Sequence, residues 1–200
     1  MVERYPGYDV LAKWNSPSFD DPTRSVLSDR LGRVPERSFL SEEAWGLLDA
    51  VVGRLIPQPD RADPIAITPW IDAMLAAGRG DGYRHEGVPT LREAWLRGLA
   101  GIATEAKALN SREFATLDPA EQDALLSRVQ RGEATGEHWR GLPADHFFGH
   151  ILLRTVVGIY YSHPEAWSEI GFGGPASPRG YVRMGFDGRD PWDAGEARDG

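Results

Sequence analysis

The stretch from Ile151 to Tyr181 constrains the fold most, because its two halves have opposite characters. The first half is the most apolar run of the chain and predicts a buried helix. The second half is rich in glycine and proline, yet it carries Trp167, Ile170 and Phe172. Ordinary surface loops are polar, so a loop with large apolar side chains is expected to pack on its own core or on a partner.

Helical spacing of apolar residues recurs along the rest of the chain. Ser41 followed by two glutamates predicts a helix start, and Asp118-Pro119 with Glu121 predicts another. No strand-like alternation of convincing length is present, so the chain is predicted to be all-α, a single domain of about five helices. The predicted helices are 41–56, 65–78, 90–109, 118–132 and 143–162. The predicted organisation is an irregular N-terminal arm (1–38), a helical domain (39–181) and a polar tail (182–200).

Composition excludes several classes of function. The chain carries 22 basic and 30 acidic residues, a net charge of −8, with no block of Lys or Arg. Nucleic acid and anionic membrane are therefore not expected as partners. Cysteine is absent, which excludes disulfides, iron–sulfur clusters, thiolate zinc sites, covalently attached haem and a cysteine nucleophile. The N-terminus does not read as a signal peptide and no apolar run is long enough to span a bilayer, so a soluble protein is expected.

The N-terminal arm contains Tyr5, Tyr8, Trp14 and Phe19 among several prolines. A segment this aromatic is not expected to lie free in water. Two interpretations stay open: the arm wraps its own domain, or it lies on another subunit. Three tryptophans in or near loops are further interface candidates, Trp139, Trp167 and Trp192.

His146 and His150 are four residues apart and would share one face of the last helix. Two histidines at this spacing can bind a metal, with Asp145 as a third ligand. However, adjacent residues on a helix point about 100° apart, and Arg154 one turn further on would repel a cation. We therefore expect a polar stripe that faces solvent, an internal hydrogen-bond network or a partner. A stand-alone metal-binding domain or enzyme using the two histidines is the alternative.

Other candidate chemistry is weaker still. Residues 171–175 lack a preceding strand, a G-x-G-x-x-G pattern and a G-K-[ST] pattern, so dinucleotide binding is not expected. The glycines of this loop are expected to allow positive φ and close approach of the backbone. Ser162, His163 and Glu165 are neighbours in sequence, which does not make a triad, and no nucleophile elbow is present. We therefore predict no catalytic residue, no metal site and no cofactor in this chain.

The run YYSHPEAWSEIGFGGPASPRGY (160–181) resembles the C-terminal signature of the gluconate 2-dehydrogenase subunit 3 family. The family pattern is an apolar helix ending in two tyrosines, then H-P-x-x-W, I-G-[FY]-x-G-P and P-x-G-Y. Segments 39–60 and 118–126 resemble the first helix and the middle of the family. The matching signature positions are Tyr160, Tyr161, His163, Pro164, Trp167, Ile170, Gly171, Phe172, Gly174, Pro175, Pro178, Gly180 and Tyr181.

This resemblance implies a non-catalytic accessory subunit of a bacterial dehydrogenase complex that oxidises a sugar, sugar acid or polyol. The partner would be a large flavoprotein similar to glucose–methanol–choline oxidoreductases, which carries the FAD, with a cytochrome subunit as a further partner in some complexes. The signature residues are expected to bind the large subunit, and the stripe His146, His150 and Arg154 is expected to lie near it. Because a twin-arginine signal is not found, a cytoplasmic location is expected; export with the partner to the periplasm is the alternative.

Overall fold

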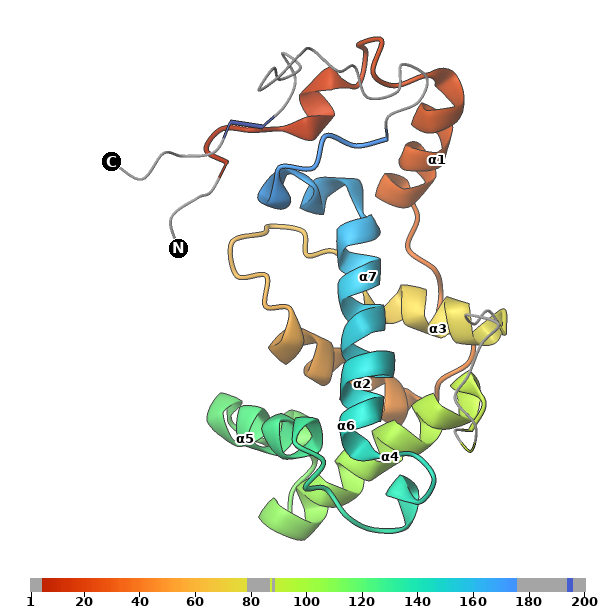
Figure 1. The fold of residues 1–200 in the computed structure, drawn as a ribbon, viewed down its shortest axis with the longest axis vertical. Coiled ribbons are helices and arrows are strands. Elements are labelled where there is room, and N and C mark those ends of the chain that lie inside the picture. Colours follow the sequence, from red (N-terminus) through yellow and green to blue (C-terminus); the bar gives the residue numbers. More distant parts are fainter. Residues whose placement is uncertain (1–4, 79–86, 88, 176–193, 196–200) are drawn as a thin grey trace. The chain divides into compact units, whose positions relative to one another are not determined.

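The computed structural model describes residues 5–78, 87, 89–175 and 194–195 (Figure 1). Within these residues the secondary structure is helical, with α-, 3₁₀- and π-helical segments and no strand. The predicted all-α class is therefore confirmed. No helix in the described part of the chain combines the length and the apolar character needed to cross a bilayer.

The helix count differs from the expected five. The described residues contain seven α-helices: α1 (Asp21–Gly32), α2 (Glu42–Leu55), α3 (Thr68–Ala76), α4 (Leu91–Asn110), α5 (Pro119–Gln130), α6 (Ala144–His146) and α7 (Arg154–Ser162). A π-helical segment, η4 (Phe147–Leu153), lies between α6 and α7 and divides the predicted last helix. Helices α2 to α5 form where the sequence predicts them.

Helix α1 corrects the expectation that the N-terminal arm is irregular. Within α1, all of which the structure describes, Leu27 is the buried residue, so its apolar stripe is too thin to stand out in the sequence. The start signal was nevertheless present. The Asp20 side chain accepts a hydrogen bond from the Thr23 amide (2.9 Å), and Pro22 lies in the first turn. This is the same chemistry that marks Asp118-Pro119.

The chain forms two compact units. Unit 1 comprises residues 1–34 and 160–200, and unit 2 comprises residues 35–159. The division falls within α7.

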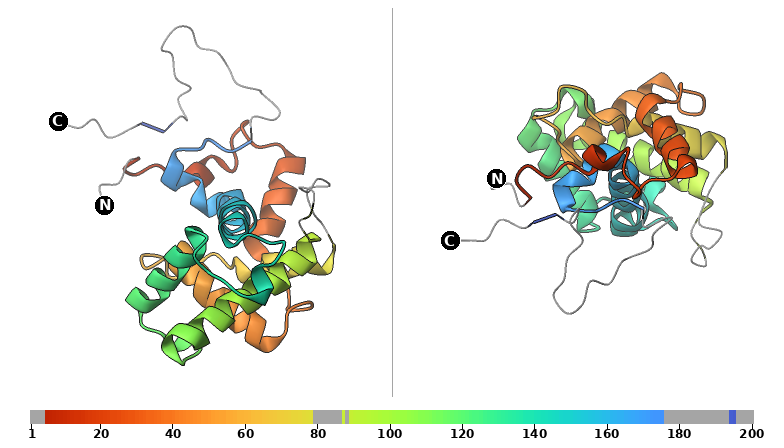
Figure 2. Two further views of the ribbon diagram at one scale, coloured as in Figure 1. Left: turned by 60° about the horizontal axis from the view of Figure 1, so that its bottom comes forward. Right: turned by 90° about the horizontal axis from the view of Figure 1, so that it is seen from above.

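Unit 2 is a bundle in which α2, α4 and α5 contact one another and α3 contacts α2 (Figure 2). Segment η4 contacts both α4 and α5. The α4 side chains Trp95, Leu99 and Ile102 are fully or almost fully buried at its centre. These residues form the inner face of α4.

Two glycines let aromatic rings approach α4 closely. A methyl group at Gly98 would overlap the Phe147 ring, and one at Gly101 would overlap the ring of Trp139. Phe147 also packs edge-on against Trp95, with ring centroids 5.9 Å apart. Both contacts exist only because α4 has no side chain at these positions.

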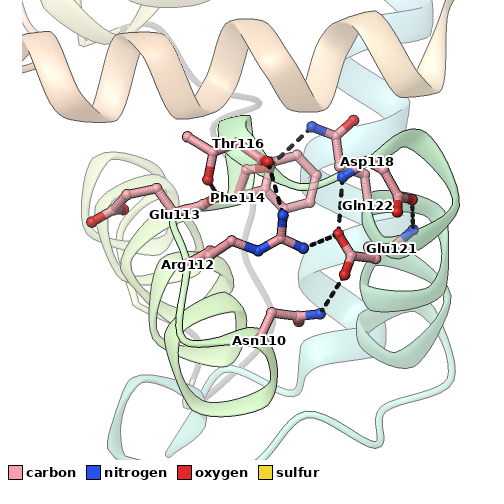
Figure 3. A network of polar contacts seen from close by, with 8 residues as sticks. All are labelled: Asn110, Arg112, Glu113, Phe114, Thr116, Asp118, Glu121 and Gln122. Carbon is pink, nitrogen blue, oxygen red and sulfur yellow. Dashed lines mark hydrogen bonds and ion pairs between the residues drawn. The ribbon is translucent and has the colours of Figure 1, made fainter.

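A polar network fixes the corner between α4 and α5 (Figure 3). Asp118 and Glu121 form a capping box, in which each side chain accepts a hydrogen bond from the other residue's amide at 2.9 Å. Glu121 also forms an ion pair with Arg112 and accepts a hydrogen bond from Asn110. Gln122, largely buried, donates to the Phe114 carbonyl at 3.0 Å. The start of α5 predicted from sequence is therefore confirmed in detail.

In unit 1 the N-terminal residues pack against the segment that follows α7. Its buried cluster contains Val10, Phe19, Leu27 and Trp167, with Tyr8, Leu11 and Trp14 packed against it. The 3₁₀ helix η1 (Val10–Lys13) and α1 both contact η5 (Pro164–Ala166). Figure 2 shows the N-terminal segment, in red, beside the C-terminal segment, in blue. The aromatic N-terminal residues thus pack on the protein's own chain, the first of the two interpretations that the sequence left open.

Candidate partner-binding surface

The signature segment begins at the C-terminal end of α7, where the last backbone carbonyls of a helix have no intrahelical partner. The indole Nε1 of Trp167 donates to the Tyr161 carbonyl at 2.8 Å. The Arg30 guanidinium of α1 donates to the Ser162 carbonyl at 2.7 Å, and a cation is also favoured at this end of the helix dipole. The signature tryptophan is therefore a helix cap as well as a core residue.

Tyr160 ties the helix end to the next turn. Its ring is 5% exposed, and its hydroxyl donates to both carboxylate oxygens of Glu169, at 2.8 and 2.9 Å. Glu169 belongs to η6 (Ser168–Ile170). The chain direction after α7 is thus set by side-chain hydrogen bonds at both Tyr160 and Trp167.

Two signature glycines adopt backbone conformations that other residues avoid. Gly171 has φ +65° and Gly174 has φ +78°. A Cβ atom at Gly171 would lie 2.6 Å from the Tyr5 ring, and one at Gly174 would lie 3.0 Å from the Phe19 ring. The expectation that these glycines serve positive φ and close approach is confirmed.

Three signature side chains face solvent in unit 1. The exposed fractions are 46% for Ile170, 39% for Phe172 and 37% for Tyr161. Phe172 is held in place, because its amide donates to the Trp167 carbonyl at 2.9 Å and its ring packs edge-on against the Trp167 ring at 5.3 Å. An exposed aromatic ring resting on a buried one is presented in a defined orientation.

The predicted binding residues therefore divide into distinct sets. Tyr160, Pro164, Trp167 and Gly174 are buried; His163, Gly171 and Pro175 are partly exposed; Tyr161, Ile170 and Phe172 are exposed. Pro178, Gly180 and Tyr181 lie outside the described residues, as does Trp192. Trp139, also considered an interface candidate, is 8% exposed and packs on Gly101, so it belongs to the core of unit 2.

The stripe of His146, His150 and Arg154 lies in unit 2. His146 is partly exposed and the other two are exposed, so the stripe faces solvent within its own unit. The two imidazole rings are stacked, with centroids 4.8 Å apart. The Asp145 carboxylate accepts a hydrogen bond from the His146 amide at 2.8 Å. Across the described ranges no group of three His, Asp or Glu residues could hold a metal ion, so the metal-binding alternative gains no support.

The sequence analysis missed Asp72, which is fully buried in α3. Its carboxylate accepts hydrogen bonds from the amides of Ser38 (2.6 Å), Phe39 (3.1 Å) and Leu40 (2.6 Å), and from the Ser38 hydroxyl (3.1 Å). Burial acts to raise the pKa of Asp72, but the hydrogen bonds from these three residues outweigh it and the pKa is lowered. Asp72 therefore fixes the backbone of residues 38–40, which lead into α2.

Arg92 has a comparable structural role at the other end of α3. Its guanidinium donates to the carbonyls of Leu75 (2.6 Å) and Ala76 (2.5 Å) and lies over the Phe39 ring, 5.4 Å from the centroid. The sequence did contain a signal that Asp72 is buried. This acid lies on the same helix face as Ile71 and Leu75 and interrupts its apolar pattern. No pattern indicated its distant partners.

A comparison with protein families gives a match to the family described as gluconate 2-dehydrogenase subunit 3, over residues 42–174. This range covers most of unit 2 and the described signature segment as far as Gly174. No curated protein and no solved structure matches the chain.

Proposed function

The chain belongs to the gluconate 2-dehydrogenase subunit 3 family, and on that premise we propose that it is a non-catalytic accessory subunit. In this proposal it binds and stabilises or matures the catalytic subunit of an FAD-dependent dehydrogenase that oxidises a sugar, sugar acid or polyol. The catalytic subunit is a flavoprotein of the glucose–methanol–choline type, which alone binds FAD. A cytochrome subunit is a further partner in the same assembly.

The observation that carries the proposal is the pair Ile170 and Phe172. Both are large, apolar and exposed, at 46% and 39%. They lie on a short loop whose backbone is fixed by hydrogen bonds and by glycines at positive φ. Protein interfaces favour apolar and aromatic anchors that are already ordered before binding, because less conformational entropy is then lost.

The distribution of polar groups agrees with an accessory role. The buried carboxylates and guanidinium contacts of unit 2 serve helix ends and corners, as with Asp72 and Arg92. The two histidines singled out by their spacing face solvent and stack on each other. The contacts of Asp72 and Arg92 stabilise the fold, and the proposal assigns the oxidation to the partner.

The experiment measures the dissociation constant between this chain and a flavoprotein of the glucose–methanol–choline type from the same organism, both purified. The test variant is Ile170→Asp with Phe172→Asp, which places two charges in the proposed interface. Leu96→Asp is a matched control, because Leu96 is also 46% exposed but lies on α4 in unit 2. All three side chains are partly in solvent, so the substitutions are expected to leave the fold intact.

We expect the double variant to bind at least a hundredfold more weakly, since each charge would be buried without a partner. Leu96→Asp should bind within about threefold of wild type, a difference of less than about 1 kcal/mol. Equal binding by the double variant and wild type would refute the assigned surface. Absence of any flavoprotein binding by the wild-type chain would refute the function.

A further inference from the structure

The docking loop, defined here as residues 168–174, is held by the N-terminal segment, residues 5–32. The Val10 amide donates to the Ser168 hydroxyl at 3.1 Å. The Tyr5 ring lies against Gly171 and the Phe19 ring lies against Gly174. The start, the middle and the end of the loop are thus each in contact with the N-terminal segment.

Phe19 connects the docking loop to the buried cluster of unit 1. It is 1% exposed and shares a buried cluster with Trp167, the residue on which Phe172 rests. Trp14 packs edge-on against it, with ring centroids 6.1 Å apart. A side chain buried to this degree cannot touch a partner directly, so any effect of Phe19 on binding must pass through the loop.

The N-terminal segment lies outside the residues that match the family, which begin at residue 42. The matched range therefore contains the docking loop but lacks the N-terminal residues that contact it. Arg30 adds a further link from this segment, through its hydrogen bond to the Ser162 carbonyl. Contacts between the N-terminal segment and residues 162–174 hold unit 1 together.

We infer that the N-terminal segment is a positioning element for partner binding, which holds Ile170 and Phe172 in the conformation that the flavoprotein recognises. This inference rests on the proposed function. A loop ordered in advance binds more tightly than the same loop when it must be ordered on contact. Loosening the segment should therefore weaken binding without altering any exposed side chain.

The test compares Phe19→Leu with Phe114→Leu in the full-length chain. Both phenylalanines are 1% exposed, but Phe114 belongs to η2 (Phe114–Thr116) in unit 2. Flavoprotein affinity is measured well below the melting temperature of each variant, and amide hydrogen exchange of residues 168–174 is measured in the free subunit. We expect Phe19→Leu to raise the dissociation constant about tenfold and to accelerate exchange in the loop. Phe114→Leu should change the dissociation constant less than twofold and leave loop exchange as in wild type.

A second matched pair keeps the test decisive if Phe19→Leu does not fold. Val10→Ala and Val51→Ala remove the same atoms at positions that are both 0% exposed, the first in unit 1 and the second in unit 2. Weaker binding and faster loop exchange are expected for Val10→Ala alone. Wild-type affinity in either unit 1 variant, with wild-type chain binding normally, would overturn the inference and leave the proposed function standing. A wild-type chain that does not bind would overturn both, even if loop exchange responds as expected.

Discussion

The two units of this protein differ in how they treat large apolar side chains. Unit 2 surrounds Trp95 and its neighbours with helices, and in its described part only Leu96 and Leu109 are large apolar residues left exposed. The described part of unit 1 is much shorter but exposes five: Val26, Val34, Tyr161, Ile170 and Phe172. Unit 1 therefore exposes more large apolar side chains, which a partner could cover. Unit 2 buries most of its large apolar side chains, as an ordinary small helical domain does.

The units also differ in how their loops are anchored. In unit 2 a buried carboxylate and backbone amides hold together segments that are more than thirty residues apart, as between Asp72 and Leu40. In unit 1 aromatic rings and glycines hold the docking loop, as between Phe19 and Gly174. This contrast predicts that substitutions in unit 2 mainly change stability, whereas substitutions in unit 1 mainly change binding.

The largest effect on stability is expected for Asp72→Ala. It leaves the amides of Ser38, Phe39 and the buried Leu40 without their acceptor. We expect the free energy of unfolding to fall by about 3–4 kcal/mol, measured by urea denaturation. Asp123→Ala is the control, because it removes an exposed ion pair with Arg54 in the same unit. A loss no greater than that of the control would show that Asp72 is not an anchor.

A smaller loss is expected for Gly98→Ala. The added methyl group would overlap the Phe147 ring, and such overpacking costs about 1–3 kcal/mol. Gly53→Ala is the matched control in α2, because a Cβ atom there meets nothing within 4 Å. It should raise the free energy of unfolding by about 0.5–1 kcal/mol, since alanine favours helix. Equal melting temperatures for the two variants would contradict the close packing of η4 on α4.

Trp167→Phe tests the cap in unit 1. The variant keeps an aromatic ring in the cluster but removes the hydrogen bond from Nε1 to the Tyr161 carbonyl. We expect a loss of about 1 kcal/mol, together with faster amide exchange at the end of α7. Exchange unchanged in residues 160–166 would indicate that the indole does not cap the helix.

The weakest effect is a pH dependence due to Asp72. Its pKa in the folded chain is below the ordinary value of 3.8, because amide hydrogen bonds favour the charged form despite burial. The resulting stabilisation is complete above pH 3.8 and is lost as the pH falls through the lowered pKa. The stability difference between wild type and Asp72→Asn should therefore be constant at neutral pH and shrink in acid. A difference that stays independent of pH down to about pH 2 would refute the lowered pKa.

Much of unit 2 could be predicted from sequence because its signals are local. Ser41 and Asp118 cap their helices as expected, and the predicted inner face of α4 is buried at Trp95, Leu99, Ile102 and Ala106, although its last residue, Leu109, is exposed. Helix α1 was missed because burial of Leu27 alone gives no periodic pattern. The division of the last helix by η4 was missed as well, since a π-helical segment keeps the apolar composition of an α-helix.

The candidate site was only partly accessible to sequence reasoning. The signature identified the segment, and the role of Gly171 and Gly174 followed from their chemistry. Which side chains point inward did not follow, because it depends on distant residues such as Tyr5 and Phe19. Trp167 and Phe172 looked alike in sequence, yet the first is a buried cap and the second an exposed ring.

We propose that unit 1 presents the partner-binding surface. The most direct measurement is amide hydrogen exchange of this chain, free and in complex with the flavoprotein. We expect the largest gain in protection on binding in residues 168–174, with little change in α5 and η3 (Glu137–Trp139) of unit 2. Protection confined to unit 2, with the loop exchanging as fast in the complex as in the free chain, would contradict it.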